Sequence, residues 1–210
     1  MPPVLVTDFD GTITERDFYQ LVIDHAPAAD CWGEYLSGRL THFEAMRAIL
    51  AHAPTDEATL AGMLAETRPD PQLGAAAAAL RRAGWELVVA SAGCAWYIER
   101  ILRAAGVRAE VHANPGRIEP GRGLAMELPR ASRFFSAQTG IDKEAVVRDA
   151  LARSGRVAFA GDGPPDLAPA LLVEGGLRFA RGWLAGELVR RGLAFQPFRR
   201  WSEIAAALLG

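Results

Sequence analysis

The sequence predicts an α/β fold with a doubly wound, mostly parallel sheet. Three short apolar runs carry this prediction, residues 3–9, 86–90 and 157–160. They end respectively in Asp8-Phe9-Asp10-Gly11-Thr12, Ser91-Ala92-Gly93 and Gly161-Asp162-Gly163. Small and polar residues directly after buried strands are typical of an open parallel sheet with its site at the carboxyl ends of the strands.

Segments of helical length separate and follow these runs. We expect helices over 71–83, 95–105, 142–153 and 201–209. Gly84 and Gly106 stand where a helix commonly ends in a left-handed glycine, and Gly155 lies near the end of the third helix. The resulting β-α-β alternation supports the doubly wound sheet.

Residues 16–70 do not fit the alternation, because they contain helical stretches and no convincing strand. One stretch begins at Thr41 with Glu44 in capping-box spacing, and another begins at Thr55. We therefore predict a helical cap over 16–70 and a catalytic core over 1–15 and 71–210. Two glycines and paired short runs predict a β-hairpin or irregular flap near 114–129.

Composition excludes several classes of function. Half of the residues are hydrophobic, 23% are charged and the formal net charge is −2, so neither a nucleic-acid footprint nor a polybasic membrane patch is present. No apolar run approaches the ~18 residues of a membrane span, and the first residues lack a leader pattern. Cys31 and Cys94 could pair, but two cysteines without an export signal predict free thiols. We expect a cytoplasmic protein.

Asp8 and Asp10 form the first candidate site. Two residues apart at a strand end, they point to one side while Phe9 points away. Two carboxylates this close repel each other unless one is protonated or a cation lies between them, and hard oxygen ligands suit Mg²⁺. The pair alone is weak evidence, because such pairs also occur in surface turns.

A second acidic pair strengthens the case for magnesium. Asp162 and Asp166 follow the apolar run at 157–160 within Gly161-Asp162-Gly163-Pro164-Pro165-Asp166. A tight turn with an N-cap aspartate would explain them equally well if they stood alone. Together with Asp8 and Asp10 they predict an oxygen cage at neighbouring strand ends, with Asp166 as a ligand or as support for one.

A phosphate site is predicted from two further features. Ser91-Ala92-Gly93 places a hydroxyl and backbone N–H groups between a strand and a helix, although an ordinary tight turn would look the same. Lys143 is the single lysine beside 22 arginines. A compact ammonium between a carboxylate and a phosphate oxygen cannot be replaced by a planar guanidinium, whereas a surface position would tolerate arginine.

In chain order, the DFDGT segment at 8–12, SAG at 91–93, Lys143 and GDxxxD at 161–166 resemble the four motifs of the haloacid dehalogenase superfamily. This resemblance implies a Rossmann-like core. The helical insert resembles the small cap of the phosphoserine phosphatase-like branch. Within that branch the chain is most similar to the phosphatases of methionine salvage that act on 2-hydroxy-3-keto-5-methylthiopentenyl-1-phosphate, although a cysteine-rich insert of some members is missing from 114–140.

The resemblance implies a role for each matching residue. Asp8 would be the nucleophile and a Mg²⁺ ligand, and Asp10 the general acid and base with its backbone carbonyl on the metal. Asp162, with Asp166, would complete the metal site. Gly11, Ser91, Ala92, Gly93 and Lys143 would hold the phosphoryl group. The substrate would be a small phosphorylated metabolite.

In the cap, Asp17 and Arg47 stand where phosphoserine phosphatases carry a glutamate and an arginine that grip the substrate. The shorter Asp17 departs from that pattern and disfavours phosphoserine. Arg47 could contact any anionic or carbonyl-bearing substrate, or could be a solvated helix residue. The histidines have no metal-ligand spacing and are most simply surface or helix residues, and only His42, near Arg47, could face substrate.

Other functions stay open on the same residues. Phosphoserine hydrolysis would need the cap to grip an amino acid. Transfer of the phosphoryl group to an acceptor other than water would differ only in what enters the cap. Dehalogenation is disfavoured because it would not need Asp10 or a magnesium cage. An inactive phosphate-binding module would be expected to have lost Asp8, Asp10, Lys143 or Asp162, and all four are present.

Overall fold

The computed structural model describes residues 1–210 and is built around a six-stranded sheet. All neighbouring strands of this sheet are parallel. Its order is β10 (Gln196–Pro197), β9 (Arg178–Ala180), β8 (Val157–Gly161), β1 (Val4–Thr7), β2 (Glu86–Cys94) and β3 (Glu110–Asn114). The predicted fold class is confirmed.

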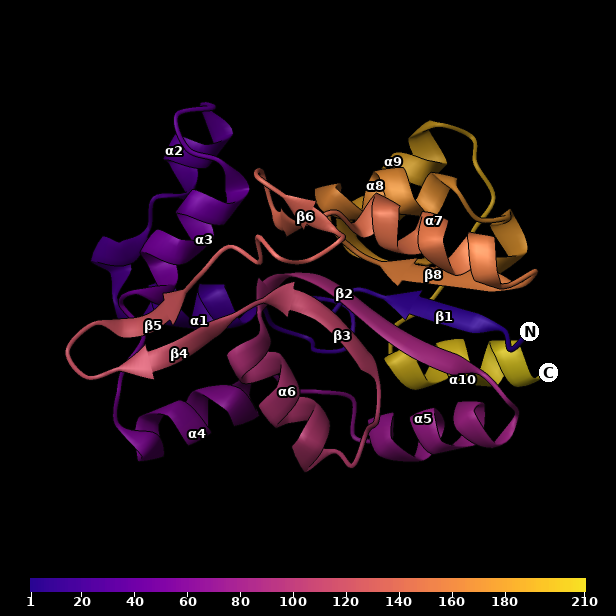
Figure 1. Cartoon of the computed structure of the whole chain (residues 1–210), viewed down its shortest axis with the longest axis horizontal. Coiled ribbons are helices and arrows are strands. Elements are labelled where there is room, and N and C mark those ends of the chain that lie inside the picture. The colour runs from indigo at the N-terminus through magenta and orange to yellow at the C-terminus, as the bar shows by residue number, and fades with distance from the viewer.

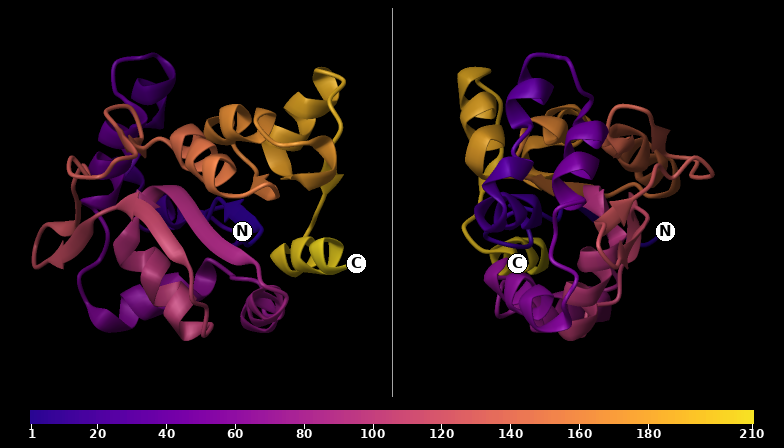
Figure 2. Two further views of the ribbon diagram at one scale, coloured as in Figure 1. Left: turned by 45° about the vertical axis from the view of Figure 1, so that its right-hand side comes forward. Right: turned by 90° about the vertical axis from the view of Figure 1, so that its left-hand side faces the viewer.

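Helices cover both faces of the sheet, because alternate strand residues point to opposite sides. Leu5 of β1 lies in an apolar cluster with the helices α5 (Leu73–Arg82), α6 (Ala95–Ala104) and α10 (Trp201–Leu209). Val4 and Val6 lie in a second cluster with α7 (Lys143–Arg153), α8 (Leu167–Leu171) and α9 (Gly182–Arg190). Figure 1 shows the two helical layers above and below the sheet, and Figure 2 shows α10 beside α5.

Several boundaries differ from the predicted ones. β1 ends at Thr7, so Asp8 and Asp10 belong to the turn that follows the strand. β2 continues to Cys94 through a register shift, so Ser91-Ala92-Gly93 closes the strand instead of following it. Gly84 and Gly106 adopt left-handed φ angles of 84° and 68° at the ends of α5 and α6, as expected.

The insert after β1 contains only helices. These are α1 (Phe18–His25), the 3-10 turn η1 (Pro27–Ala29), α2 (Trp32–Leu36), α3 (His42–Leu50) and α4 (Glu57–Glu66). The capping box is confirmed, because the Glu44 N–H donates to Thr41 Oγ1 at 3.1 Å and the Thr41 N–H donates to Glu44 Oε2 at 2.8 Å. The start predicted for α4 was one residue early, since Asp56 is the cap that accepts from the Thr59 N–H.

The insert does not have a core of its own. Phe18, Ile49 and Leu60 of its helices belong to the same 34-residue apolar cluster as Leu73 and Trp201 of the sheet-covering helices. A unit that shares its buried side chains with the sheet is expected to move little as a rigid body. The division of the chain at 16 and 70 stays a prediction.

Two hairpins lie beside the insert. The predicted one comprises β4 (Gly116–Glu119) and β5 (Gly123–Met126), and β5 packs against α3 (Figure 1). The second, β6 (Phe135–Ser136) and β7 (Gly140–Ile141), was not predicted, and neither were β3, β9, β10 and α9. The Phe43 N–H of α3 donates to Gln138 O at 2.8 Å, which ties the insert to this second hairpin.

None of the helices combines the length and the apolar character that crossing a membrane would require.

Candidate active site

The site begins where β1 and β8, paired in the middle of the sheet, both end. Asp8 follows β1, and its N–H donates to Ala160 O of β8 at 2.8 Å, which fixes the backbone of Asp8 against that strand. Asp162 directly follows β8. Parallel neighbours end at the same edge of a sheet, so the two carboxylates are brought to one place although they are far apart in the sequence.

Lys143 is bound between two carboxylates. Its Nζ lies 2.8 Å from Asp8 Oδ1 and 2.7 Å from Asp166 Oδ1, and the side chain is 5% exposed. Burial alone would lower the pKa of Lys143, but the attraction of Asp166 and Asp8 outweighs it and raises the pKa above its ordinary value. The ammonium is therefore charged and held in a fixed position.

Asp166 organises the loop after β8. Its Oδ1 accepts the hydrogen bond from Lys143, and its Oδ2 accepts from the backbone N–H groups of Asp162 and Gly163, both at 3.0 Å. A Cβ at Gly161 would lie 2.6 Å from the Asp166 carboxylate carbon, so only glycine leaves room for it. With these partners, Asp166 has less free coordination capacity than Asp8 or Asp162.

Carboxylate oxygens of Asp8, Asp162 and Asp166 lie within 4.8 Å of one another. Burial and repulsion by Asp166 raise the pKa of Asp8 well above its usual range, and the same two causes raise the pKa of Asp162 to about 7. A divalent cation beside these oxygens would remove the repulsion and keep both carboxylates ionised. A hard, oxygen-only donor set fits Mg²⁺.

The Asp10 carboxylate is not part of this cluster, which corrects the expectation of an oxygen cage built from Asp8, Asp10 and Asp162. Its Oδ1 accepts from the Phe18 N–H at 3.0 Å and its Oδ2 accepts from the Tyr97 hydroxyl at 2.5 Å. Burial, followed by repulsion from Asp17, raises the pKa of Asp10 to about 7. A carboxyl group with this pKa can both give and take a proton near neutral pH.

Tyr97 was missed by the sequence analysis. It is fully buried and stacks on Phe18 at 4.6 Å between ring centroids. Tyr97 lies in the first turn of α6, and Gly93 lies near the end of β2. A Cβ at Gly93 would collide with the Tyr97 hydroxyl oxygen.

The Ser91-Ala92-Gly93 segment lines the cavity, but one of its expected free donors is used internally. The Gly93 N–H donates to Ser91 Oγ at 3.0 Å. Asn114 stabilises the segment, because its Nδ2 donates to Ala92 O at 2.8 Å and to Thr139 O at 3.1 Å. The Ser91 hydroxyl keeps its own proton for a ligand, because its oxygen accepts this bond.

Gly11 turns the chain and does not line the cavity, contrary to expectation. Its φ is 68°, and a Cβ there would lie 2.4 Å from Asp162 Oδ2. Its carbonyl accepts a hydrogen bond from Arg181, which also donates to Thr14 O and Arg199 O. Thr12 Oγ1 donates to Asp162 Oδ1 at 2.9 Å, so the turn after β1 holds the carboxylate at the end of β8 in place.

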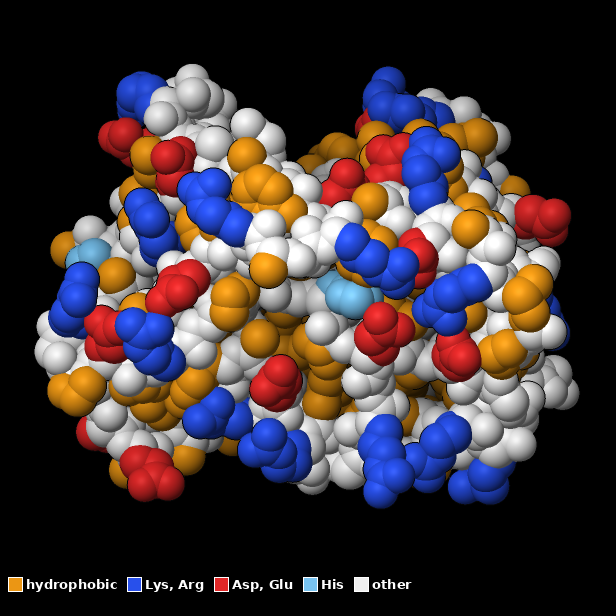
Figure 3. Space-filling model, viewed as in Figure 1, with side chains coloured by type: hydrophobic (Ala, Val, Ile, Leu, Met, Phe, Trp, Pro, Cys, Tyr) orange, Lys and Arg blue, Asp and Glu red, His pale blue; other side chains and the backbone are white.

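These residues form one end of a cavity of about 440 Å³ between the sheet and the insert. Eighteen residues line it: Asp8, Asp10, Asp17, Tyr19, Trp32, Tyr35, Leu36, His42, Met46, Ser91, Ala92, Gly93, Lys143, Asp162, Gly163, Pro164, Pro165 and Asp166. The space-filling view shows the surface hollowed between the lobe of α2 and the lobe of α8 and α9 (Figure 3). Asp17 and His42 both line the cavity.

Arg47 does not reach it. The residue lies on the other side of α3, in a depression that it shares with Arg122, Ala125 and Met126. Its guanidinium lies 5.7 Å from the centroid of the Phe43 ring. The expected substrate contact of Arg47 is therefore corrected: helical periodicity turns Met46 toward the cavity and its neighbour toward the hairpin.

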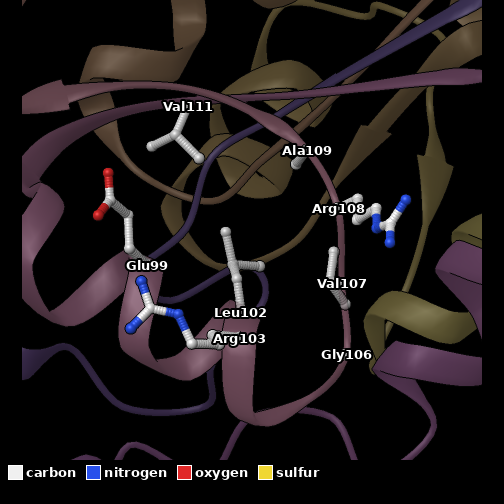
Figure 4. Close-up of a pocket in the computed structure, with 8 residues that line it drawn as sticks. All are labelled: Glu99, Leu102, Arg103, Gly106, Val107, Arg108, Ala109 and Val111. Carbon is white, nitrogen blue, oxygen red and sulfur yellow. The ribbon is translucent and has the colours of Figure 1, made fainter.

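A larger groove of about 680 Å³ lies between α6 and β3 (Figure 4). Leu102 of α6 and Val111 of β3 line it, together with Glu99 and Arg103. Its volume exceeds that of the aspartate-lined cavity. It contains one carboxylate, no strand-end loop and no buried lysine, and its residues therefore offer no comparable chemistry.

Comparison with known proteins agrees with this architecture. The profile of the haloacid dehalogenase-like hydrolases matches residues 5–170. No curated protein sequence matches the chain. Among solved structures, a substrate-bound phosphoserine phosphatase is similar over 98% of both chains, with 15% identity and a TM-score of 0.68.

Two bacterial structures give the same picture. A probable phosphoserine phosphatase of Vibrio cholerae is similar over 100% of this chain and 65% of its own, with 20% identity and a TM-score of 0.70. A phosphoserine phosphohydrolase-like protein of Francisella tularensis covers 98% and 99%, with 18% identity and a TM-score of 0.64. At these identities the likeness concerns the fold, and the profile, which spans more than half of the chain, shows that this protein belongs to the haloacid dehalogenase-like hydrolases.

Proposed function

We propose that this protein is a Mg²⁺-dependent phosphomonoester hydrolase that works through an aspartyl-phosphate on Asp8. The contact of Asp8 with Lys143 at 2.8 Å, in the cavity that Asp162 also lines, carries this proposal. An ionised carboxylate needs no activating base, but a phosphate dianion repels it, and the neighbouring ammonium offsets that repulsion.

In the first step Asp8 Oδ attacks phosphorus, and the bond from phosphorus to the leaving alcohol breaks. Lys143 and the Ser91 hydroxyl would hold the non-bridging phosphoryl oxygens. Asp10, held by Phe18 and Tyr97, would donate its proton to the departing oxygen. This step leaves Asp10 ionised and the phosphoryl group on Asp8.

In the second step Asp10 takes a proton from water, and the hydroxide oxygen attacks phosphorus to release inorganic phosphate and free Asp8. One group serves both steps because its pKa of about 7 lies near neutral pH. Bound Mg²⁺ would supply positive charge beside the phosphoryl oxygens. Asp8 and Asp162 would hold it through their carboxylates and Asp10 through its backbone carbonyl, with Asp166 keeping Asp162 and Lys143 in place.

The test is Mg²⁺-dependent phosphate release from a panel of phosphomonoesters, combined with trapping of the intermediate. Hydroxylamine reacts with acyl phosphates, so wild-type protein quenched during turnover should carry a hydroxamate at Asp8 that Asp8→Asn lacks. Turnover without any label at Asp8 would contradict the covalent route, and absence of turnover with every phosphomonoester would contradict the hydrolase.

The substrate is a finer proposal. The resemblance of the sequence to methionine-salvage phosphatases suggests 2-hydroxy-3-keto-5-methylthiopentenyl-1-phosphate, which carries an apolar thioether tail and no carboxylate. Phosphoserine and transfer to another acceptor are the alternatives. The distance of Arg47 from the cavity favours the first candidate over phosphoserine. We also propose a cytoplasmic location, which the unpaired Cys31 and Cys94 support.

A further inference from the structure

The half of the cavity formed by the insert is built of aromatic and apolar side chains. Tyr19, Trp32, Tyr35 and His42 form what we name the aromatic wall. Tyr19 and Trp32 stack with centroids 4.9 Å apart and an interplanar angle of 12°. Tyr35 lies 4.9 Å from Trp32, and His42 lies edge-on to both rings at 5.7 and 5.4 Å. Leu36, Met46 and one acidic residue, Asp17, complete this half.

The wall has apolar surface that the protein leaves uncovered. The helix α2, which carries Trp32, Tyr35 and Leu36, has no buried residue, and Leu36 is 73% exposed. A single exposed leucine is ordinary, but three large apolar residues of one short helix that all line the same cavity form a surface that binding would cover. In Figure 1, α2 lies at the outer end of the insert, away from the sheet.

The histidine of the wall adds no positive charge at neutral pH. Burial, followed by repulsion from Lys143, lowers the pKa of His42 to about 4. Its Nδ1 is buried without a hydrogen-bond partner. The ring therefore acts as a neutral aromatic surface held by Trp32 and Tyr35.

The cavity also offers no cation for a substrate carboxylate. Its charged lining residues are five aspartates and Lys143. Lys143 is already paired with two of these aspartates, Asp8 and Asp166. Arg47 lies in another depression, and the guanidinium of Arg181 is committed to three backbone carbonyls. A carboxylate on the leaving group would thus meet Asp17 and aromatic rings without a partner.

A cationic leaving group is a weaker fit than an uncharged one. A cation binds to the open face of an aromatic ring. Tyr19 and Trp32 turn a face to each other, and Tyr35 and His42 are tilted or edge-on to their neighbours, so they do not form an open cage. Asp17, the one acid of the insert in the cavity, has a pKa raised by burial and is a weakened counterion.

We propose that the aromatic wall selects phosphomonoesters whose leaving alcohol is uncharged and carries an apolar or aromatic group, and that it rejects leaving groups with a carboxylate. Trp32 and Tyr35 are the specificity-determining residues. This inference rests on the proposed function, since it names the substrate class of the same site.

The test compares four substrates with the Mg²⁺-loaded wild-type protein: 2-phenylethyl phosphate, methyl phosphate, O-phospho-L-serine and phosphocholine. We expect 2-phenylethyl phosphate to have the highest kcat/KM. Burial of a phenyl group should give it about 10- to 100-fold over methyl phosphate. Phosphoserine should be about 100-fold poorer than 2-phenylethyl phosphate, because its carboxylate is unpaired.

Variants separate the wall from a general loss of structure. Trp32→Ala should lower kcat/KM for 2-phenylethyl phosphate about tenfold more than for methyl phosphate, mainly through KM. His42→Phe keeps a flat neutral ring and should retain the preference. Trp183 is a half-exposed tryptophan of α9 outside the cavity, and Trp183→Ala is the matched control. It should leave kcat/KM unchanged for both substrates.

Three results would overturn the inference while leaving the hydrolase intact. They are a preference for phosphoserine, a preference for phosphocholine, and an equal loss with both neutral substrates in Trp32→Ala. Failure of the proposed function looks different, because then none of the four phosphomonoesters would release phosphate.

Discussion

The two halves of the cavity are built on opposite principles. At the sheet edge, the side chains of Asp8, Asp166 and Lys143 are at most 10% exposed, and the Lys143 ammonium lies at hydrogen-bond distance from both carboxylates. At the insert, Trp32, Tyr35 and Leu36 belong to a helix without a buried residue, and the rings of Trp32 and Tyr35 lie tilted with centroids 4.9 Å apart. The comparison indicates that the proposed reaction depends on buried, charged strand ends, whereas the proposed selection of the leaving group depends on partly exposed apolar surface.

The sheet half should be intolerant of any change in charge, and Asp8 should show this most strongly. Asp8→Asn removes the attacking oxygen anion but keeps the shape of the side chain. We expect kcat to fall at least 10³-fold with little loss of stability. Steady-state kinetics and thermal unfolding would be compared with wild type. A variant that kept more than about a tenth of wild-type kcat would retain a barrier within ~1.4 kcal/mol, and Asp8 would not be the nucleophile.

Asp10→Asn tests the proton carrier of the same half. The amide can still accept from Phe18 N–H, but it cannot transfer a proton, so we expect kcat to fall about 10²- to 10⁴-fold. The loss of kcat/KM, which reports the steps up to formation of the aspartyl-phosphate, should shrink with a leaving group that needs no protonation, such as 4-nitrophenol. An equal loss of kcat/KM with alkyl and nitrophenyl phosphates would rule out protonation of the leaving group by Asp10.

Lys143→Arg keeps the charge and changes the shape of the head group. The position is 5% exposed and lies between two carboxylates at 2.7 and 2.8 Å, so a longer planar fork has no room. We expect a loss of about 100-fold in kcat/KM, or ~2.7 kcal/mol. Near-wild-type kinetics would mean that the compact ammonium is not required there.

Stability should reveal the repulsion among the carboxylates. Burial raises the folded-state pKa of Asp10 and Asp162 to about 7, above the ordinary value of 3.8. Between these pH values the folded state binds more protons than the unfolded one. The contribution of these two groups to the free energy of unfolding is therefore complete below pH ~4 and is lost as the pH rises through 7. In EDTA we expect Tm to fall by on the order of 5 °C from pH 5 to pH 8.

Magnesium should reverse that fall. Bound Mg²⁺ keeps the carboxylates ionised at low cost, so saturating Mg²⁺ should raise Tm more at pH 8 than at pH 5. Asp162→Asn, measured by the same thermal scans in EDTA, should flatten the dependence on pH. A Tm that rose from pH 5 to pH 8 without metal would contradict the raised pKa values.

The smallest effect is expected at Arg47, where an earlier expectation and the geometry disagree. Because the guanidinium lies outside the cavity, Arg47→Ala should change kcat/KM less than about twofold for every substrate. An increase in KM of tenfold or more would show that α3 rotates in the substrate complex and would move Arg47 into the aromatic half.

The sequence by itself determined the strand-end chemistry. The carboxyl ends of parallel strands lie at the same edge of a sheet. Once the three apolar runs are recognised as strands, Asp8, Ser91 and Asp162 are therefore expected to lie close together. Lys143 was found from composition, because one lysine among 22 arginines marks a place where head-group shape matters. These predictions depend on local pattern, which sequence displays directly.

Only the tertiary structure decided which side chains of the insert line the cavity. Arg47 and Met46 are neighbours on α3, but a helix turns about 100° per residue, and the packing of α3 against the hairpin decides that Met46 lines the cavity and Arg47 does not. Tyr97 meets Asp10 across 87 residues for the same reason. Such contacts depend on how helices are oriented relative to the sheet, and the orientation comes from a buried cluster shared by the whole chain, not from the residues of any one segment.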